Sequence, residues 1–170
     1  ILLNSPHNPT GGVATKEDLE RIADLVRGKA VYVFADEPYC HMVWEGEHKS
    51  ILAEPGMMEQ TLAAYTFSKS YSMSGWRLGF AVGSPDLVSA IGLLINTSAS
   101  CTPTLAQRAG IAALEKDQET RDDYMLRFRR KVERLSAGLK KIEGFKVEQP
   151  KGTFYVFPDV RVACNKLGIT

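Results

Sequence analysis

The sequence predicts an α/β fold in which a mostly parallel sheet is flanked by helices. Three short runs, at 31–35, 62–67 and 78–82, are apolar and rich in β-forming residues, as expected of strands that are covered on both faces. The chain also starts on an apolar run, 1–3, and a helical pattern separates this run from the next strand. Such an alternation of strand and helix is typical of a βαβ unit.

The first helix is expected directly after a loop at 5–12. Thr15 and Asp18 have the spacing of a capping box, in which the threonine hydroxyl accepts a backbone N–H. Gly28 is expected to end the helix, because glycine readily adopts the left-handed conformation that follows many helices. Between these signals, apolar side chains recur at spacings of three and four and form one face: Leu19, Ile22, Ala23 and Val26.

Two further helices are expected in the middle of the chain. Ser84, Pro85 and Asp86 form a helix start, with an N-cap serine, a proline at the first position and an acid in the first turn. Another start lies at 102–103, and that helix is expected to continue to about Lys116. The predicted apolar face of the helix that begins near Ser84 consists of Leu87, Val88, Ile91, Leu94 and Ile95.

A long helix is expected from 118 to 142, followed by two strands. Apart from one apolar face, the surface of this long helix is charged, which fits a solvated surface better than a nucleic-acid contact. After Gly144, residues 145–149 alternate between apolar and polar, and 153–157 follow a turn, so both segments are predicted as strands. A subdomain boundary is expected near the long helix. The predicted buried face of that helix comprises Tyr124, Phe128, Val132, Leu135, Leu139 and Ile142.

Composition and charge exclude several classes of protein. The 170 residues include 21 Lys and Arg against 20 Asp and Glu, which argues against a nucleic-acid binder that relies on a strong basic field. No apolar run approaches the roughly 20 residues of a membrane span. Three widely spaced cysteines without a CxxC pair predict neither a metal site nor a disulfide scaffold, and they favour a reducing cytoplasm. Cys101 and Cys164 are expected to be buried.

Polar residues of three different kinds follow three of the predicted strands. Asn8 lies in the loop after the first strand, Asp36 ends the second and Lys69 ends the third. Because ligands of open α/β sheets bind outside the carboxyl ends of the strands, these side chains are expected to converge. Taken singly, each has an ordinary structural explanation, as a turn residue, a cap and a surface lysine respectively. Taken together, they indicate a shared site.

The chemistry of this set is that of a pyridoxal-phosphate site. A lysine can form a Schiff base with the aldehyde of a cofactor. An acid can keep a pyridine nitrogen protonated, so that the ring remains an electron sink. An arginine such as Arg77 can bind a phosphate in bidentate fashion, together with hydroxyl groups. The same arginine could instead pair with a surface acid.

Four stretches of the sequence match the motifs of a known family: NSPHNPTG at 4–11, ADEPY at 35–39, TFSKSYSMSGWRLG at 66–79 and PKGTFYV at 150–156. In these stretches the sequence resembles the class I and II aminotransferases of the aspartate aminotransferase superfamily, which have fold type I. The resemblance extends over the whole chain. It implies pyridoxal-phosphate-dependent transamination between an α-amino acid and a 2-oxo acid, through a Schiff base at Lys69. It also implies a homodimeric, cytoplasmic enzyme of amino-acid metabolism, without nucleic-acid or membrane partners.

The resemblance implies a role for each of seven residues. Lys69 would be the catalytic residue, which carries the cofactor and then moves the substrate proton. Asp36 would pair with the pyridine nitrogen. The remaining expected contacts are Tyr39 and Asn8 at the ring oxygen, and Arg77, Thr66 and Ser68 at the phosphate.

The resemblance also implies a division of the chain. Residues 1–117 would be part of the large cofactor-binding domain, 118–142 an interdomain helix and 143–170 the start of the small α+β domain. The chain would then be a central segment of a longer protein. The family's arginine for the substrate carboxylate has no counterpart here, because Arg161 comes too early. Two alternatives therefore stay open: another fold type I reaction, such as that of a β-lyase, and a catalytically silent fragment.

Overall fold

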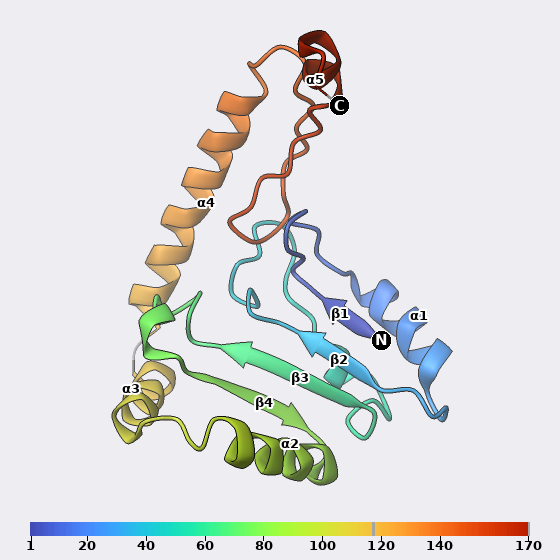
Figure 1. Cartoon of the computed structure of the whole chain (residues 1–170), viewed down its shortest axis with the longest axis vertical. Coiled ribbons are helices and arrows are strands. Elements are labelled where there is room, and N and C mark those ends of the chain that lie inside the picture. Colours follow the sequence, from blue (N-terminus) through green and yellow to red (C-terminus); the bar gives the residue numbers. More distant parts are fainter. Residues whose placement is uncertain (117, 170) are drawn as a thin grey trace.

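The computed structural model describes residues 1–116 and 118–169. Its centre is one four-stranded sheet with strands in the order β1-β2-β3-β4 (Figure 1). The first three strands are parallel, and β4 is antiparallel to β3. The α/β class and the mostly parallel sheet are therefore as the sequence predicts. The strands are β1 (Leu2–Asn4), β2 (Val33–Asp36), β3 (Thr61–Thr66) and β4 (Gly79–Gly83).

The direction of β4 differs from that of its neighbours, although its apolar run has the composition of a buried parallel strand. The segment between β3 and β4 contains only the 3-10 helix η2 (Ser74–Trp76) and no α-helix that could cross the sheet. Without such a crossover, the chain returns antiparallel. A second 3-10 helix, η1 (Ile51–Ala53), lies between β2 and β3. In the described residues β4 is an edge strand, and three of its five residues are exposed.

Helix α1 (Lys16–Val26) begins with the predicted capping box. The backbone N–H of Asp18 donates to the Thr15 hydroxyl at 3.2 Å, and the Thr15 N–H donates to the Asp18 carboxylate at 3.0 Å. The buried face of the helix packs on the strands. This hydrophobic core comprises Leu19, Ala23, Val26, Val33, Ala35, Ile51, Met57 and Ala63.

Truncation of Leu19 is expected to destabilise the protein by about 2–5 kcal/mol, because Leu19→Ala leaves a cavity in this core. The side chain is only 1% exposed. Urea denaturation measures the change. The matched control is Leu25→Ala on the same helix, where the leucine is 67% exposed, and the expected change there is within about 0.5 kcal/mol. Equal effects of the two variants would contradict this account of the core.

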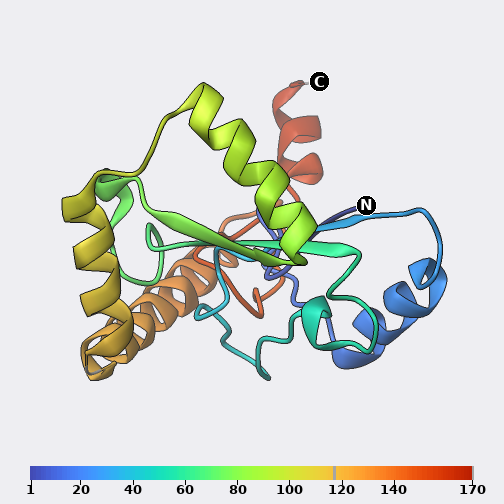
Figure 2. The ribbon, with the colours of Figure 1, turned by 90° about the horizontal axis from the view of Figure 1, so that it is seen from below.

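Helices α1 and α2 (Pro85–Ser98) lie on opposite faces of the sheet (Figure 2). The predicted start of α2 is confirmed, since the Ser84 hydroxyl accepts the N–H of Leu87 at 3.4 Å. Its apolar face differs from the expectation, because α2 has no buried residue in the part of the chain that the structure describes. Leu93 and Leu94, for example, are both about two-thirds exposed. Among the described helices and strands, α2 packs mainly on β4.

Helix α3 (Thr104–Glu115) and the long helix α4 (Glu119–Leu139) follow near the predicted positions, and α4 rises away from the sheet (Figure 1). The face that α4 buries is rotated relative to the prediction. Tyr124, Leu135 and Ile142 are nearly half exposed, whereas Met125 and Ser136 are buried with Val132. The reason is local packing against the loop after β2. This second core comprises Tyr39, Met42, Trp44, Met125 and Val132, with Phe128, Phe154, Tyr155 and Val156 beside it.

The prediction of two strands near the end of the chain is wrong. Segments 145–149 and 153–157 are irregular, and only single bridges form, at Lys146–Asp159 and Val43–Gly152. The proline at 158 lacks an N–H for a ladder. The turn at 150–153 instead pairs with the loop after β2.

Three details complete the fold. Helix α5 (Arg161–Leu167) was not predicted from the sequence. Cys101 is exposed and Cys164 is partly buried, so the expectation of two buried cysteines is wrong for Cys101 and only partly met for Cys164. None of the helices in residues 1–116 and 118–169 combines the length and the apolar character needed to cross a membrane.

Candidate active site

The carboxyl ends of β1 and β2 bring Asn4 and Asp36 side by side. The parallel register pairs these two residues, each of which is the last in its strand. The Asn4 side-chain amide donates to the Asp36 carbonyl oxygen at 2.8 Å and to the carboxylate Oδ2 at 3.2 Å. Asp36 is partly buried, and this desolvation raises the pKa of its carboxyl group. A carboxylate therefore lies at the carboxyl end of β2, and among the described residues one side-chain amide donates to it.

The loop that carries Asn8 is fixed at both of its sides. The Asn8 backbone N–H donates to Oδ1 of Asn4 at 2.8 Å. Further along, the N–H groups of Lys151 and Gly152 donate to the Gly11 carbonyl oxygen at 3.0 and 2.9 Å. Gly11 has φ +70°, and a Cβ there would lie 2.3 Å from the Cβ of Pro150, so only glycine allows this close approach. The returning end of the chain thus holds the Asn8 loop.

Tyr39 lies three residues beyond Asp36 and is buried at 3% exposure. Its hydroxyl is 3.0 Å from the hydroxyl of Tyr155, a residue of the returning segment. Burial, reinforced by this contact, raises the pKa of Tyr39, while a hydrogen bond with the Asn8 side chain lowers it. The phenol is therefore held in its protonated form, with Asn8 and Tyr155 at its oxygen.

Lys69 follows β3 in the third position after its last residue. The Nζ atom lies 5.9 Å from the ring centre of Tyr39 and 5.4 Å from that of Phe154. Within residues 1–116 and 118–169 the structure gives this amine no hydrogen bond and no ion pair. The amine thus stands against two aromatic faces and has no polar partner in the described chain.

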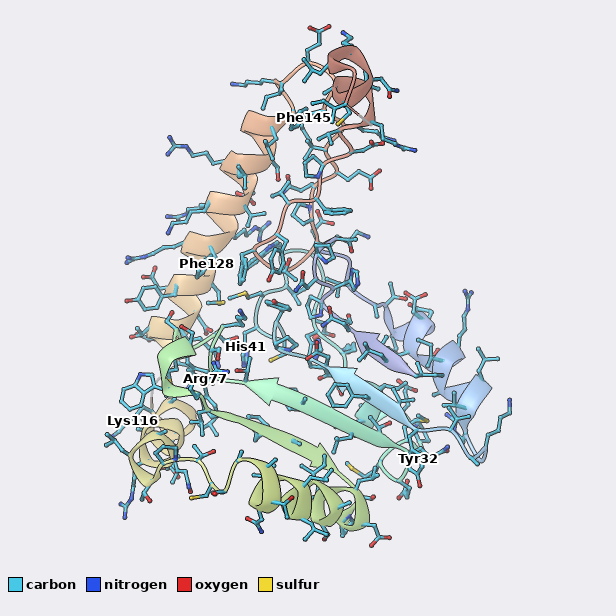
Figure 3. The ribbon with its side chains drawn as sticks, viewed as in Figure 1. Tyr32, His41, Arg77, Lys116, Phe128 and Phe145 are labelled. Carbon is cyan, nitrogen blue, oxygen red and sulfur yellow. The ribbon has the colours of Figure 1, made fainter. Side chains whose placement is uncertain are left out.

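The residues expected to bind a phosphate frame the segment between β3 and β4. The Thr66 hydroxyl accepts the backbone N–H of Ser68 at 3.1 Å and lies 3.4 Å from the Leu78 carbonyl oxygen. Arg77 is exposed, has φ +53°, and donates from Nη1 to the Ser74 carbonyl oxygen at 2.9 Å. Figure 3 shows Arg77 near the carboxyl end of β3. Among the described residues, most donors of the Arg77 guanidinium therefore have no partner and are available to an anion.

The sequence prediction missed three residues that complete this site. Asn4 and Phe154 belong to motifs that the sequence reveals, but neither was assigned a role. Tyr155 reaches Tyr39 across 116 residues of sequence. The one signal that could have identified Asn4 is its place at the end of the first apolar run.

A family model described as aminotransferase class I and II matches residues 1–167. The chain belongs to this family. Members are generally dependent on pyridoxal phosphate, and the resemblance seen in the sequence is thereby confirmed. The aminotransferase fold also accounts for the mostly parallel sheet with helices on both faces.

Aminotransferases with different named activities match the chain. It is 38% identical over 170 residues to an aspartate aminotransferase of Bacillus sp. strain YM-2, covering 99% of this chain and 43% of the relative. It is 35% identical over 173 residues to an asparagine–oxo-acid transaminase of Streptococcus mutans, covering 100% and 44%. A solved aromatic aminotransferase from Pyrococcus horikoshii is 35% identical with a TM-score of 0.89, covering 94% and 43%. The chain thus spans less than half the length of these aminotransferases.

The donor set at the sheet edge fits pyridoxal phosphate. An unpartnered amine suits the aldehyde, a carboxylate suits the pyridine nitrogen, and a phenol beside an amide suits the ring oxygen. The exposed guanidinium of Arg77 suits the phosphate. The side chains expected at the cofactor are Asn8, Asp36, Tyr39, Thr66, Ser68, Lys69 and Arg77, and in kind they suit its aldehyde, pyridine nitrogen, ring oxygen and phosphate.

Proposed function

We propose that the protein carrying this chain catalyses pyridoxal-phosphate-dependent transamination between an α-amino acid and a 2-oxo acid. The surroundings of Lys69 support this most directly. The amine has no polar partner in the described residues, and it faces the buried ring of Tyr39, three residues beyond Asp36. A partly buried amine that has no polar partner among the described residues is available to a ligand.

In this proposal each side chain binds a different part of the cofactor. Asp36 holds the pyridine nitrogen as its counter-ion, and Asn4 keeps that carboxylate in place. Tyr39 and Asn8 hydrogen-bond the ring oxygen. The phosphate contacts are Arg77, Thr66 and Ser68.

Lys69 is the proposed catalytic residue. When bound, the cofactor supplies an electron sink that stabilises negative charge at the substrate's α-carbon. The Nζ of Lys69 would then accept the proton from the substrate's α-carbon as a general base and deliver it to the C4′ carbon of the cofactor as a general acid. The aromatic rings of Tyr39 and Phe154 limit the paths by which water reaches this nitrogen.

We propose the same division of the chain as the resemblance implies, with the cofactor domain before α4 and the small domain after it. The boundary at 117 lies outside the described residues. The core that joins α4 to Tyr39 and Trp44 supports a helix that links the two parts. A homodimer in the cytoplasm is part of the proposal. The substrate is an α-amino acid of a type that we leave to experiment, because the relatives act on aspartate, asparagine and aromatic substrates by name.

Chemical trapping tests the proposal. The protein is mixed with pyridoxal phosphate, its visible absorbance is recorded, the mixture is reduced with borohydride, and the labelled peptide is mapped by mass spectrometry. Label is expected on Lys69 and is expected to disappear in Lys69→Arg. The matched control is Lys141→Arg, an exposed lysine beyond α4, which is expected to keep the label. Labelling spread over surface lysines, or none at all, would overturn the proposal.

An amino-acid screen then identifies the reaction. Transamination predicts that a labelled amino group passes to a 2-oxo acid. Release of pyruvate and ammonia without a 2-oxo acid would instead identify a β-lyase.

A further inference from the structure

Asn4 lies between two of the proposed cofactor contacts and uses both ends of its amide. Its Nδ2 donates to Asp36, at 2.8 Å to the carbonyl oxygen and at 3.2 Å to Oδ2. Its Oδ1 accepts the backbone N–H of Asn8 at 2.8 Å. One side chain thus connects the end of β2 with the loop after β1.

Asp36 depends on this one donor. In residues 1–116 and 118–169, the hydrogen bond from Asn4 is the only one that its carboxylate receives. Desolvation alone raises the pKa of Asp36, which disfavours the charged form needed to face a pyridinium ion. A hydrogen bond that is donated to a carboxylate favours the charged form, so Asn4 opposes the effect of burial.

Asn8 depends on Asn4 in a different way. The Asn8 backbone N–H has its partner in Asn4 Oδ1, and this bond sets where the loop leaves β1. The side chain of Asn8 reaches the Tyr39 hydroxyl from that backbone position. Because a displacement of about 1 Å is enough to weaken a positioned contact severely, the anchor decides whether Asn8 and Tyr39 act on the same atom.

We infer that Asn4 is a positioning residue that couples the two sides of the cofactor ring. It keeps Asp36 ionised and oriented at the pyridine nitrogen, and it holds Asn8 at the ring oxygen, without contacting the cofactor. This inference rests on the proposed function. A merely structural Asn4 would close the end of the β1–β2 ladder, and its loss would lower stability without changing how cofactor binding depends on pH.

Two variants separate the two ends of the amide. Asn4→Leu has a similar size and removes both the donor and the acceptor. Asn4→Asp keeps an acceptor for the Asn8 N–H but loses the donor, and it adds a like charge beside Asp36. The control is His7→Ala in the same loop, which removes the 2.7 Å contact between His7 Nδ1 and the Thr10 hydroxyl and leaves the Asn4 bonds intact.

The measurement is the dissociation constant of pyridoxal phosphate from the apoprotein between about pH 5 and 9, with the thermal midpoint of each apoprotein as a folding control. Asn4→Leu is expected to weaken binding at pH 8 by roughly 10- to 100-fold, the loss of a hydrogen bond to a charged group. The pH below which binding weakens is expected to rise by about one unit in both Asn4 variants. Asn4→Asp is expected to lose less affinity at pH 8, because its loop anchor remains. His7→Ala is expected to behave as wild type.

The outcomes distinguish the inference from the proposed function. Wild-type protein that fails to bind pyridoxal phosphate overturns both. Wild-type binding with unchanged affinity and pH dependence in Asn4→Leu overturns the inference alone. Lower thermal midpoints in the Asn4 variants, with binding curves that superimpose on wild type at every pH, also overturn it, since Asn4 would then be structural.

Discussion

Replacing Lys69 by alanine is expected to reduce the rate of transamination by about 10²–10⁴-fold or more. General acid–base catalysis by a positioned side chain contributes a factor of that size, and the variant also loses the amine that carries the cofactor. The folded structure should tolerate the change. Lys69 has no hydrogen bond or ion pair among the described residues, so its removal leaves no buried polar group unpaired.

Single-turnover kinetics measure this effect. The protein is loaded with pyridoxal phosphate, mixed with the amino acid identified by screening, and the decay of the visible band is followed. Lys69→Arg should fail to the same degree, because arginine keeps a positive charge but stays protonated and cannot accept the α-proton. Lys141→Ala serves as the control and should react at the wild-type rate. A Lys69→Ala protein that retained more than about a tenth of the rate would show that another base moves the proton.

Local signals account for the elements that the sequence predicted well. The capping box of α1 and the start of α2 each involve residues within four positions of one another, so their hydrogen bonds need no tertiary partner. The three parallel strands were also predictable, because a short apolar run between turn residues is typical of a buried strand. Their boundaries differ from the prediction by one or two residues.

Long-range packing explains the elements that the sequence did not predict. The segment at 153–157 has the composition of a strand, yet in the described chain it pairs with none of the strands of the sheet. Its start instead pairs with the loop after β2, where the Thr153 N–H donates to the Met42 carbonyl oxygen at 2.8 Å. The face of α4 that is buried depends on the same loop, through Trp44 and Met42. Neither contact can be predicted from the periodicity of the sequence.

The residues of the candidate site also differ in whether local sequence signals could predict them. Asp36 and Lys69 could be proposed as functional because each is a charged residue directly after a buried run, which is unusual without a ligand. The place of Asn4 at the end of the first apolar run was the one available signal, but its contact with Asp36 arises from the register of β1 against β2 and is not visible in the sequence. Tyr155 could not be proposed, since its partner Tyr39 lies 116 residues away. The end of a strand can be predicted from the sequence, whereas the contacts that hold the residues at that end can be identified only from the structure.

Asp36→Asn is expected to have opposite effects on catalysis and on stability. Asparagine cannot serve as a negative counter-ion for a protonated pyridine nitrogen, so the rate of transamination should fall by roughly 10²-fold or more, the value of a charge-assisted hydrogen bond. The apoprotein should gain stability at neutral pH. Burial raises the pKa of Asp36 in the folded state, so the ionised carboxylate is less favourable there than in the unfolded chain.

The sign of this stability change depends on pH in a defined way. A raised folded-state pKa means that the folded protein binds the proton more tightly, so the cost of the charge is fully present above that pKa. As the pH falls through the raised pKa towards the ordinary value of about 3.9, wild-type Asp36 becomes protonated and the cost disappears. Urea denaturation of the apoproteins should therefore show Asp36→Asn more stable than wild type at pH 7, with the difference vanishing below about pH 4. A variant that was less stable at pH 7 would mean that Asp36 supports the fold, and the stability cost assigned to a cofactor-binding carboxylate would be wrong.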